Sequence, residues 1–164
     1  MIDHIVFDVD GTLTDGGIII SSDGVESKRF NVRDGQIMVM LPQIGFTTIF
    51  LTGRNSELTS IRAAELHISV VIQNAHNKAE VLHNFFDING LTGDQFAYVG
   101  DDINDYAAMK LCSFKACPLD AANEIKKLSD YISPNKGGHG AVRDICEHLL
   151  HKQNVHGKFI ERFT

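Results

Sequence analysis

Two aspartates separated by one residue, Asp8 and Asp10, directly follow the apolar run His4–Phe7. Side chains alternate along an extended chain, so these two carboxylates point to the same side. Gly11 allows a sharp turn immediately after them. In an open α/β sheet the ligand crevice lies beyond the carboxyl ends of the strands, where such a pair would stand. The alternative is a polar turn that uses Asp and Gly only for their backbone conformation.

A second acidic group lies far along the chain, where Asp101, Asp102 and Asp105 follow the apolar run Phe96–Val99. Carboxylates this close raise one another's pKa values unless a cation lies among them. Oxygen ligands without nitrogen or sulfur partners suit Mg²⁺. One residue of this group, Asp102 or Asn104, is expected to cap the following helix instead. The spacing of this second group therefore predicts a magnesium site.

Two shorter features lie between the acidic groups. Thr52, Gly53 and Arg54 follow another strand-like run and offer a hydroxyl and a turn that can hold phosphoryl oxygens. Lys78 begins a helical pattern, where a lone lysine is most often an exposed surface residue. Each feature is weak by itself, and its place in the order along the chain is what gives it weight.

Short apolar runs alternate with longer amphipathic segments, which predicts an α/β fold with a mostly parallel sheet covered on both faces, a Rossmann-like three-layer sandwich. The expected strands are His4–Phe7, Thr47–Leu51, Val70–Ile72, Phe96–Val99 and Phe114–Cys117. The expected helices are Gly35–Gln43, Ser56–Leu66, Lys78–Phe86, Asn104–Leu111, Ala121–Lys127 and Ala141–Leu150.

One segment interrupts the alternation. Residues 17–30 form two β-rich arms around Asp23-Gly24, which predicts a small hairpin inserted after the first strand. Residues 133–140 are expected to form a flexible loop, and residues 155–164 a loose tail. No linker divides the chain, so we expect a single domain over residues 1–164.

Composition narrows the possible partners. The chain has 164 residues and a formal net charge of −6, which disfavours sequence-independent binding to nucleic acid or to anionic membranes. Cys112, Cys117 and Cys146 form no metal-binding pattern and are expected to be reduced, buried thiols. The amino terminus has no basic signal region and no apolar run is long enough to span a membrane, so we expect a cytoplasmic protein.

Taken together, the segments DVDGT from Asp8, the hydroxyl residue Thr52, Lys78 and GDDxxD from Gly100 resemble, in type and order, the haloacid dehalogenase-like phosphatase superfamily. The resemblance implies that Asp8 is a nucleophile that accepts a phosphoryl group, and that Asp10 protonates the leaving oxygen and later activates water. It also implies that Thr52 and Lys78 hold phosphoryl oxygens. The implied Mg²⁺ ligands are the Asp8 carboxylate, the Asp10 backbone carbonyl and Asp101, with Asp102 or Asp105 in the outer shell.

A narrower resemblance extends to about Arg143. The segments Asp8–Gly17, Phe30–Gly35 and Gly137–Arg143 are similar to those of the 3-deoxy-manno-octulosonate 8-phosphate phosphatases of lipopolysaccharide biosynthesis. Those enzymes carry a hairpin instead of a cap domain, and they assemble as homotetramers in which a neighbouring subunit helps to close each site. The implied substrate is a sugar-acid phosphate, whose carboxylate arginine can bind through two parallel hydrogen bonds. The substrate-binding positions so implied are Asp10, Asn31, Arg33, Asp34, Gly35, Gly53, Arg54, Arg62 and Lys78.

Two departures leave alternatives open. Residues 36–39 carry no cation where that family is expected to have an arginine, and His139 stands where an arginine is frequent. A phosphatase for a related nine-carbon, sialic-acid-type sugar-acid 9-phosphate therefore remains an alternative. A more remote one is a non-enzymatic receiver-like phospho-switch, in which the acidic pair would come first and the phospho-acceptor on a later strand. A catalytically idle scaffold and a phosphotransfer or mutase activity are further alternatives.

Overall fold

The structure is a computed structural model that describes residues 1–163. A six-stranded, entirely parallel sheet runs through its centre in the order β5-β4-β1-β6-β7-β8. The strands are β1 (His4–Phe7), β4 (Thr47–Leu51), β5 (Val70–Ile72), β6 (Phe96–Val99), β7 (Phe114–Cys117) and β8 (Tyr131–Ile132). The five strands expected from the sequence are confirmed at their stated bounds, and the two-residue edge strand β8 was not expected.

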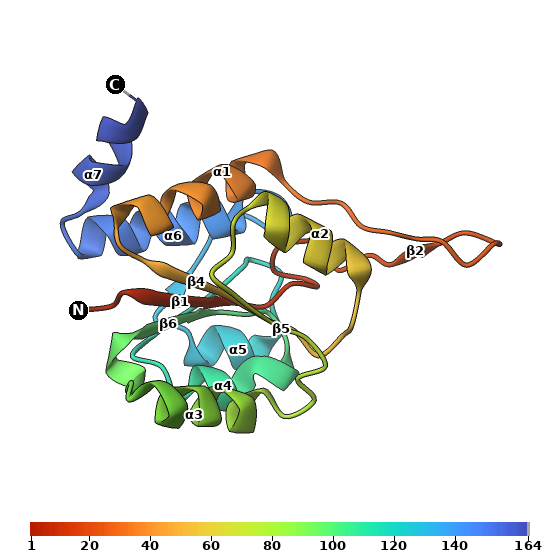
Figure 1. Cartoon of the computed structure of the whole chain (residues 1–164), viewed down its shortest axis with the longest axis horizontal. Helices are drawn as coiled ribbons and strands as arrows, with labels where there is room; N and C mark the ends of the chain where they lie inside the picture. The colour runs from red at the N-terminus through yellow and green to blue at the C-terminus, as the bar shows by residue number, and fades with distance from the viewer. Residues whose placement is uncertain (164) are drawn as a thin grey trace.

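Helices cover both faces of the sheet (Figure 1). The helices are α1 (Val32–Met40), α2 (Glu57–Glu65), α3 (Lys78–Asn89), α4 (Tyr106–Met109), α5 (Asn123–Leu128), α6 (Ala141–Lys152) and α7 (His156–Ile160). Helices α1, α2 and α6 share one apolar core with Ile5 and Phe7 of β1, whereas α3, α4 and α5 share the other with Val6. This division follows from the alternation of side chains along a strand, and the expected three-layer α/β sandwich is confirmed.

Each expected helix is present with its ends shifted by no more than three residues or, in one case, divided, and two of these differences have a clear local reason. Helix α1 begins at Val32, three residues earlier than expected, because the Asn31 side chain accepts hydrogen bonds from the N–H groups of Arg33 and Asp34. The segment expected as one helix over residues 104–111 is divided into a 3₁₀ turn at Ile103–Asp105, which Asp102 caps, and the short helix α4.

The expected hairpin is present and projects from the body of the molecule (Figure 1). Its arms are β2 (Ile19–Ile20) and β3 (Glu26–Ser27), paired antiparallel. The side chains of Ile19 and Ile20 are exposed. No cap domain is present among residues 1–163, so the hairpin is the largest insertion near the end of β1.

The carboxy-terminal segment is not the loose tail expected from its composition. Helix α7 is followed by a 3₁₀ turn at Glu161–Phe163, and Phe159 is buried beneath the guanidinium group of Arg143 at 4.9 Å. Thr164, the last residue of that expected tail, lies outside the described residues. No helix in the part of the chain that the structure describes is long and apolar enough to cross a membrane.

Candidate active site

The sheet brings the two acidic groups together at the carboxyl ends of its central strands. Strands β1 and β6 are neighbours, and Phe7 pairs with Val99. The backbone N–H of Asp8 donates to the Val99 carbonyl at 2.9 Å, so the first residue beyond β1 lies beside the first residues beyond β6. Ligand oxygens of Asp8, Asp101 and Asp105 consequently lie within 4.8 Å of one another.

The buried ammonium group of Lys78 contacts this cluster. Lys78 Nζ lies 2.6 Å from Asp8 Oδ1 and 2.6 Å from Asp105 Oδ1, and its side chain is 1% exposed. Lys78 begins helix α3, whose amino terminus Asn77 caps through its side chain. Lys78 thus contacts the proposed nucleophile Asp8 directly. In the sequence, only its place in the order of the motifs distinguishes it from a surface lysine.

Asp105 is an organising residue of the cluster. It is fully buried, and one of its oxygens accepts hydrogen bonds from Lys78 and from the hydroxyl of Tyr98 at 2.8 Å. The other accepts from the backbone N–H groups of Asp101 and Asp102. With these oxygens occupied, Asp8 and Asp101 are the carboxylates left to bind a ligand. Nothing in the sequence indicates this role of Tyr98, because a tyrosine in a buried strand has the same pattern as one that only packs in the hydrophobic core.

The cluster carries more negative charge than its ammonium group can balance. Burial, reinforced by the charge of Asp105, raises the pKa of Asp8 well above its usual range, although Lys78 opposes the shift. Burial also raises the pKa of Asp101 to about 6. Burial by itself lowers the pKa of Lys78, but the charges of Asp8 and Asp105 more than offset it, so that pKa is raised. Such a set of oxygen donors suits a divalent hard cation.

The turn after β1 is shaped around Asp101. Gly11 has φ +97°, and a Cβ on it would lie 2.1 Å from Asp101 Oδ2, so any side chain would collide with the carboxylate. The next residue, Thr12, is fully buried and donates its hydroxyl to Asp101 Oδ1 at 2.8 Å. In the sequence Thr12 is only one residue of the DVDGT segment, and nothing there indicates its contact with Asp101.

Asp10 lies between two cations. Lys28, from the hairpin arm, places Nζ 2.7 Å from Asp10 Oδ1, and Arg54 Nε lies 3.9 Å from Oδ2. Glu26 on the same arm pairs with Arg54 at 3.0 Å. Sequence reasoning did not select Glu26 or Lys28. Their signal is a pair of opposite charges two residues apart, which places both on one face of the arm.

Thr52 and Gly53 lie at the carboxyl end of the neighbouring strand β4. Because Phe7 pairs with Phe50, Thr52 lies level with Val9, beside the turn that carries Asp10. Thr52 is buried, and its hydroxyl accepts a hydrogen bond from the Arg54 N–H at 3.3 Å. The turn at Thr52–Arg54 is thereby held at the same edge of the sheet as Asp8.

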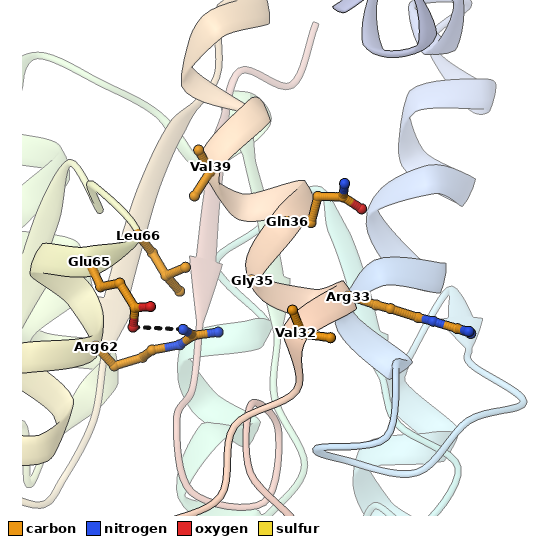
Figure 2. Close-up of a pocket in the computed structure, with 8 residues that line it drawn as sticks. All are labelled: Val32, Arg33, Gly35, Gln36, Val39, Arg62, Glu65 and Leu66. Carbon is orange, nitrogen blue, oxygen red and sulfur yellow. Dashed lines mark hydrogen bonds and ion pairs between the residues drawn. The ribbon is translucent and has the colours of Figure 1, made fainter. Parts of the chain in front are cut away.

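The remaining basic candidates lie elsewhere. Arg62 lines a cavity of about 340 Å³ between α1 and α2, where it pairs with Glu65 at 2.8 Å. Figure 2 shows this pair, with the Arg33 side chain pointing away from Arg62. Arg62 also donates to the Asn31 carbonyl, and a Cβ on Gly35 would lie 2.3 Å from its Nη2. Within residues 1–163, no hydrogen bond or ion pair joins Arg33 or Arg62 to the carboxylate cluster.

Asp34 is turned into the protein instead of toward an open site. It is 1% exposed, and its two oxygens accept hydrogen bonds from the backbone N–H groups of Gly140 and Arg143. Burial raises the pKa of Asp34. The carboxylate therefore joins α1 to the start of α6, and the substrate contact expected from the sequence stays a prediction.

The glycine-rich segment before α6 packs on its own chain. The Gly138 N–H donates to the Thr12 carbonyl at 3.1 Å, and a Cβ on Gly137 would lie 1.8 Å from the Gly11 carbonyl oxygen. Asp34 holds the end of this segment through Gly140. Residues 137–140 thus form one wall of the turn that carries Asp10.

A doubly wound parallel sheet with an aspartate pair after β1, a lysine from α3 and an acidic turn after β6 defines a haloacid dehalogenase-like hydrolase. Residues 41–145 match the family model described as haloacid dehalogenase-like hydrolase, and the chain belongs to this family.

Particular relatives can also be named. The chain is 34% identical over 146 residues to the 3-deoxy-D-manno-octulosonate 8-phosphate phosphatase KdsC of Escherichia coli K12, which covers 89% of this chain and 78% of that protein. It is also similar to the crystal structure of the corresponding phosphatase from Moraxella catarrhalis in complex with magnesium ion, phosphate ion and KDO. The two structures align with a TM-score of 0.95 and 38% sequence identity, and the alignment covers 99% of this chain and 94% of that one. The cobalt-bound Haemophilus influenzae phosphatase gives a TM-score of 0.87 at 32% identity, covering 96% of this chain and 91% of that one.

Proposed function

We propose that this protein is a Mg²⁺-dependent phosphatase that hydrolyses 3-deoxy-D-manno-octulosonate 8-phosphate to the free sugar acid and phosphate. The observation that carries the proposal is the contact of Lys78 with Asp8 beside a second open carboxylate, Asp101. The Moraxella enzyme supports the proposal, because its crystal structure contains magnesium, phosphate and KDO and aligns with the structure of this chain at a TM-score of 0.95.

The residues present fit a magnesium ion. Buried carboxylates that repel one another, opposed by one lysine, leave negative charge that a divalent cation would balance. In this proposal the Asp8 and Asp101 carboxylates and the Asp10 backbone carbonyl hold the ion, with Asp105 and Asp102 outside them. Bound there, Mg²⁺ would neutralise charge on the phosphoryl oxygens.

The first chemical step transfers the phosphoryl group to Asp8. Phosphate monoesters hydrolyse so slowly that enzymes must supply up to about 10²¹-fold acceleration, which requires several effects together. An oxygen of Asp8 forms a bond to phosphorus while the ester P–O bond breaks and its electron pair goes to the leaving oxygen. Asp10 gives that oxygen its proton, and Lys78 and Thr52 hold phosphoryl oxygens.

The second step releases phosphate. Asp10, now a carboxylate, takes a proton from a water molecule whose oxygen attacks phosphorus. The bond between phosphorus and Asp8 breaks, and its electron pair returns to the aspartate. Asp105 and Tyr98 keep the Lys78 ammonium in place through both steps, because Asp105 accepts from each of them.

The sugar-acid end of the substrate is assigned to the basic and polar residues around the site. In this proposal Arg54 and Gly53 contact the substrate from the turn after β4, and Asn31, Arg33, Gly35 and Arg62 contribute from the α1–α2 face. Within residues 1–163, no hydrogen bond or ion pair joins these four residues to the carboxylate cluster. A neighbouring subunit that presents this face to another subunit's site would join the two parts.

A homotetramer is part of the same proposal. Ile19, Ile20 and Val25 of the hairpin are 63%, 66% and 58% exposed, and burial of these side chains between subunits would stabilise an assembly. The glycine-rich segment at residues 137–140 contacts its own chain's turn, so the hairpin and the α1–α2 face are the elements assigned to a neighbour.

Three free, buried thiols fit a cytoplasmic location, where thiols stay reduced.

A nine-carbon sugar-acid phosphate is the second candidate substrate. Residues 36–39 of α1 include Gln36, whose amide oxygen accepts from Arg143, and no cation. The nine-carbon ester carries the same carboxylate and phosphate with a longer hydroxylated chain, and an uncharged amide is a suitable partner for a hydroxyl group.

The deciding experiment compares phosphate release with Mg²⁺ from the eight-carbon and nine-carbon sugar-acid phosphates, a hexose phosphate and a nucleotide. We expect kcat/KM for the eight-carbon ester to exceed that for the hexose phosphate by at least about a hundredfold, because unpaired buried polar groups reject the wrong ligand. Comparable values across the panel would contradict the substrate assignment, and a preference for the nine-carbon ester would select the second candidate.

A further inference from the structure

The active site contains a buried ammonium group that the mechanism above does not use. The side chain of Lys28 is 0% exposed, and its Nζ lies 2.7 Å from Asp10 Oδ1. This contact lacks hydrogen-bonding geometry, and Lys28 Nζ has no hydrogen-bond partner among the described residues. An ammonium group carries three N–H donors, so this one reaches Asp10 with donors to spare.

The carboxylate of Asp10 has one oxygen atom that lacks a hydrogen-bond donor in the described part of the chain. Its Oδ2 is also buried without a hydrogen-bond partner within residues 1–163. Arg54 Nε, at 3.9 Å from Oδ2, is too distant to donate a hydrogen bond. Leaving buried polar groups unpaired is destabilising, more so for charged ones. Over the described range, the Lys28 ammonium group thus lacks an acceptor, and Asp10 Oδ2 lacks a donor. An alcohol oxygen fits between two such groups, because it can accept a hydrogen bond from one and donate its own proton to the other.

The hairpin arm holds Lys28 in this position. Glu26 and Lys28 are two residues apart, so both point from one face of the arm toward the site. Glu26 pairs with Arg54 at 3.0 Å and accepts from the hydroxyl of Ser56 at 3.2 Å. The base of the hairpin is therefore fastened to the turn after β4, while its tip projects outward (Figure 1). A donor fixed before the reaction stabilises developing charge better than one that must reorganise.

We propose that Lys28 is a catalytic residue that donates a hydrogen bond to the leaving oxygen of the phosphate ester. The inference rests on the proposed function, because Asp10 must contact that oxygen to protonate it and Lys28 contacts Asp10. As the P–O bond breaks, the electron pair goes to the leaving oxygen and the proton comes from Asp10. Lys28 keeps its own proton, stabilises the oxygen while the charge develops and then pairs with the Asp10 carboxylate.

The test depends on the acidity of the leaving alcohol. Phenyl phosphate and p-nitrophenyl phosphate are similar in size and carry no sugar, but p-nitrophenol is much the stronger acid and leaves with little assistance. The ratio kcat/KM covers only the steps up to loss of the leaving group, so hydrolysis of the phosphoenzyme does not affect it. Wild type, Lys28→Met and Lys28→Arg are compared on both esters as full-length proteins with saturating Mg²⁺.

We expect Lys28→Met to lower kcat/KM for phenyl phosphate by about 10²-fold, the usual cost of losing one such donor, and to lower it at least about tenfold less for p-nitrophenyl phosphate. Lys28→Arg keeps a cationic donor and should recover part of the loss. Arg29→Met is the matched control, because it removes one positive charge from the adjacent residue, whose side chain is 67% exposed. It should leave both values unchanged.

Equal losses on the two esters would overturn the proposal, since that result describes a lysine that only anchors the hairpin or orients Asp10. Unchanged values on both would overturn it as well. If Lys28→Met does not fold, as judged by circular dichroism, the same comparison is made with Lys28→Gln. A wild-type protein that cleaves the aryl esters but not the sugar-acid phosphate would refute the assigned substrate alone, while the ratio of losses still decides the role of Lys28. A wild-type protein inactive on every ester would refute both.

Discussion

Gly11 and Asp101 lie so close that a Cβ on the glycine would stand 2.1 Å from the Asp101 carboxylate oxygen Oδ2. The turn after β1 and the turn after β6 are thus packed against each other without room for a side chain. The positive φ of Gly11, +97°, is a second reason why glycine is required there. The glycine of the first motif consequently determines where the aspartate of the last motif can be.

Replacing Gly11 by alanine should displace the Asp101 carboxylate. We expect Gly11→Ala to lower kcat/KM by about 10²-fold, the usual effect of shifting a catalytic group by an ångström, and to raise the Mg²⁺ concentration needed for half-maximal activity. Gly45→Ala is the matched control, because Gly45 has φ +100° but nothing within 4 Å of its added Cβ. Equal losses in the two variants would show that backbone strain, not the collision, is responsible.

Removing the nucleophile should separate activity from stability. Asp8→Asn retains the shape of the side chain but cannot form the phosphoenzyme, so phosphate release should fall to background. Because folding raises the pKa of Asp8, the ionised carboxylate is disfavoured in the folded protein at neutral pH. The thermal midpoint of metal-free Asp8→Asn should therefore exceed that of the wild type by several degrees. Near-normal phosphate release would contradict the covalent step.

Asp10→Asn should have a different signature. Its proposed metal contact is a backbone carbonyl, so Mg²⁺ affinity, measured by calorimetry, should stay within a few-fold of the wild type. Loss of proton transfer should lower kcat/KM for the sugar-acid phosphate by about 10²–10⁴-fold. A large loss of Mg²⁺ affinity with a normal rate at saturating metal would show that the roles of Asp8 and Asp10 are wrongly assigned.

The metal-free protein should lose stability as the pH rises toward neutrality. Folding raises the pKa of Asp101 from 3.8 to about 6, so the protonated form is favoured in the folded state. Its contribution to the free energy of unfolding is complete below pH 3.8 and is lost as the pH rises through about 6. Urea unfolding between pH 4 and pH 7 should show this decline. Asp101→Asn should reduce the slope, and an unchanged slope would assign the effect to other groups.

Charged residues on the hairpin should disrupt the proposed assembly. Ile18→Asp with Ile20→Asp places charges on side chains that are 39% and 66% exposed in the single chain. We expect light scattering to show smaller species and the KM for the sugar-acid phosphate to rise, although each proposed catalytic residue is intact. Ile88→Asp is the control, because Ile88 is 83% exposed on α3, away from the hairpin. A fully active wild-type monomer at the assay concentration would refute the tetramer.

The sequence by itself determined the sheet and the positions of the acidic motifs. Strands such as β1 and β6 are short, continuous apolar runs that end at aspartates, and parallel strands buried on both faces have this pattern. Because the carboxyl ends of parallel strands meet at one side of an α/β sheet, Asp8 and Asp101 were expected together from their places after β1 and β6. Lys78, which begins a helix, was expected beside them only through the family resemblance. The cap at Asn31, by contrast, depends on neighbouring residues only, but the apolar periodicity that predicts helices does not indicate it.

Tertiary structure alone decided which polar residues face the site. Lys28 is buried against Asp10 because the hairpin arm folds back over the turn after β1, and Asp34 is turned inward by N–H groups more than a hundred residues away. A charged residue in a short polar segment has the same sequence pattern whether it faces solvent or a buried partner. The difference is the free energy of desolvation and pairing, which depends on contacts between distant segments that local periodicity does not record.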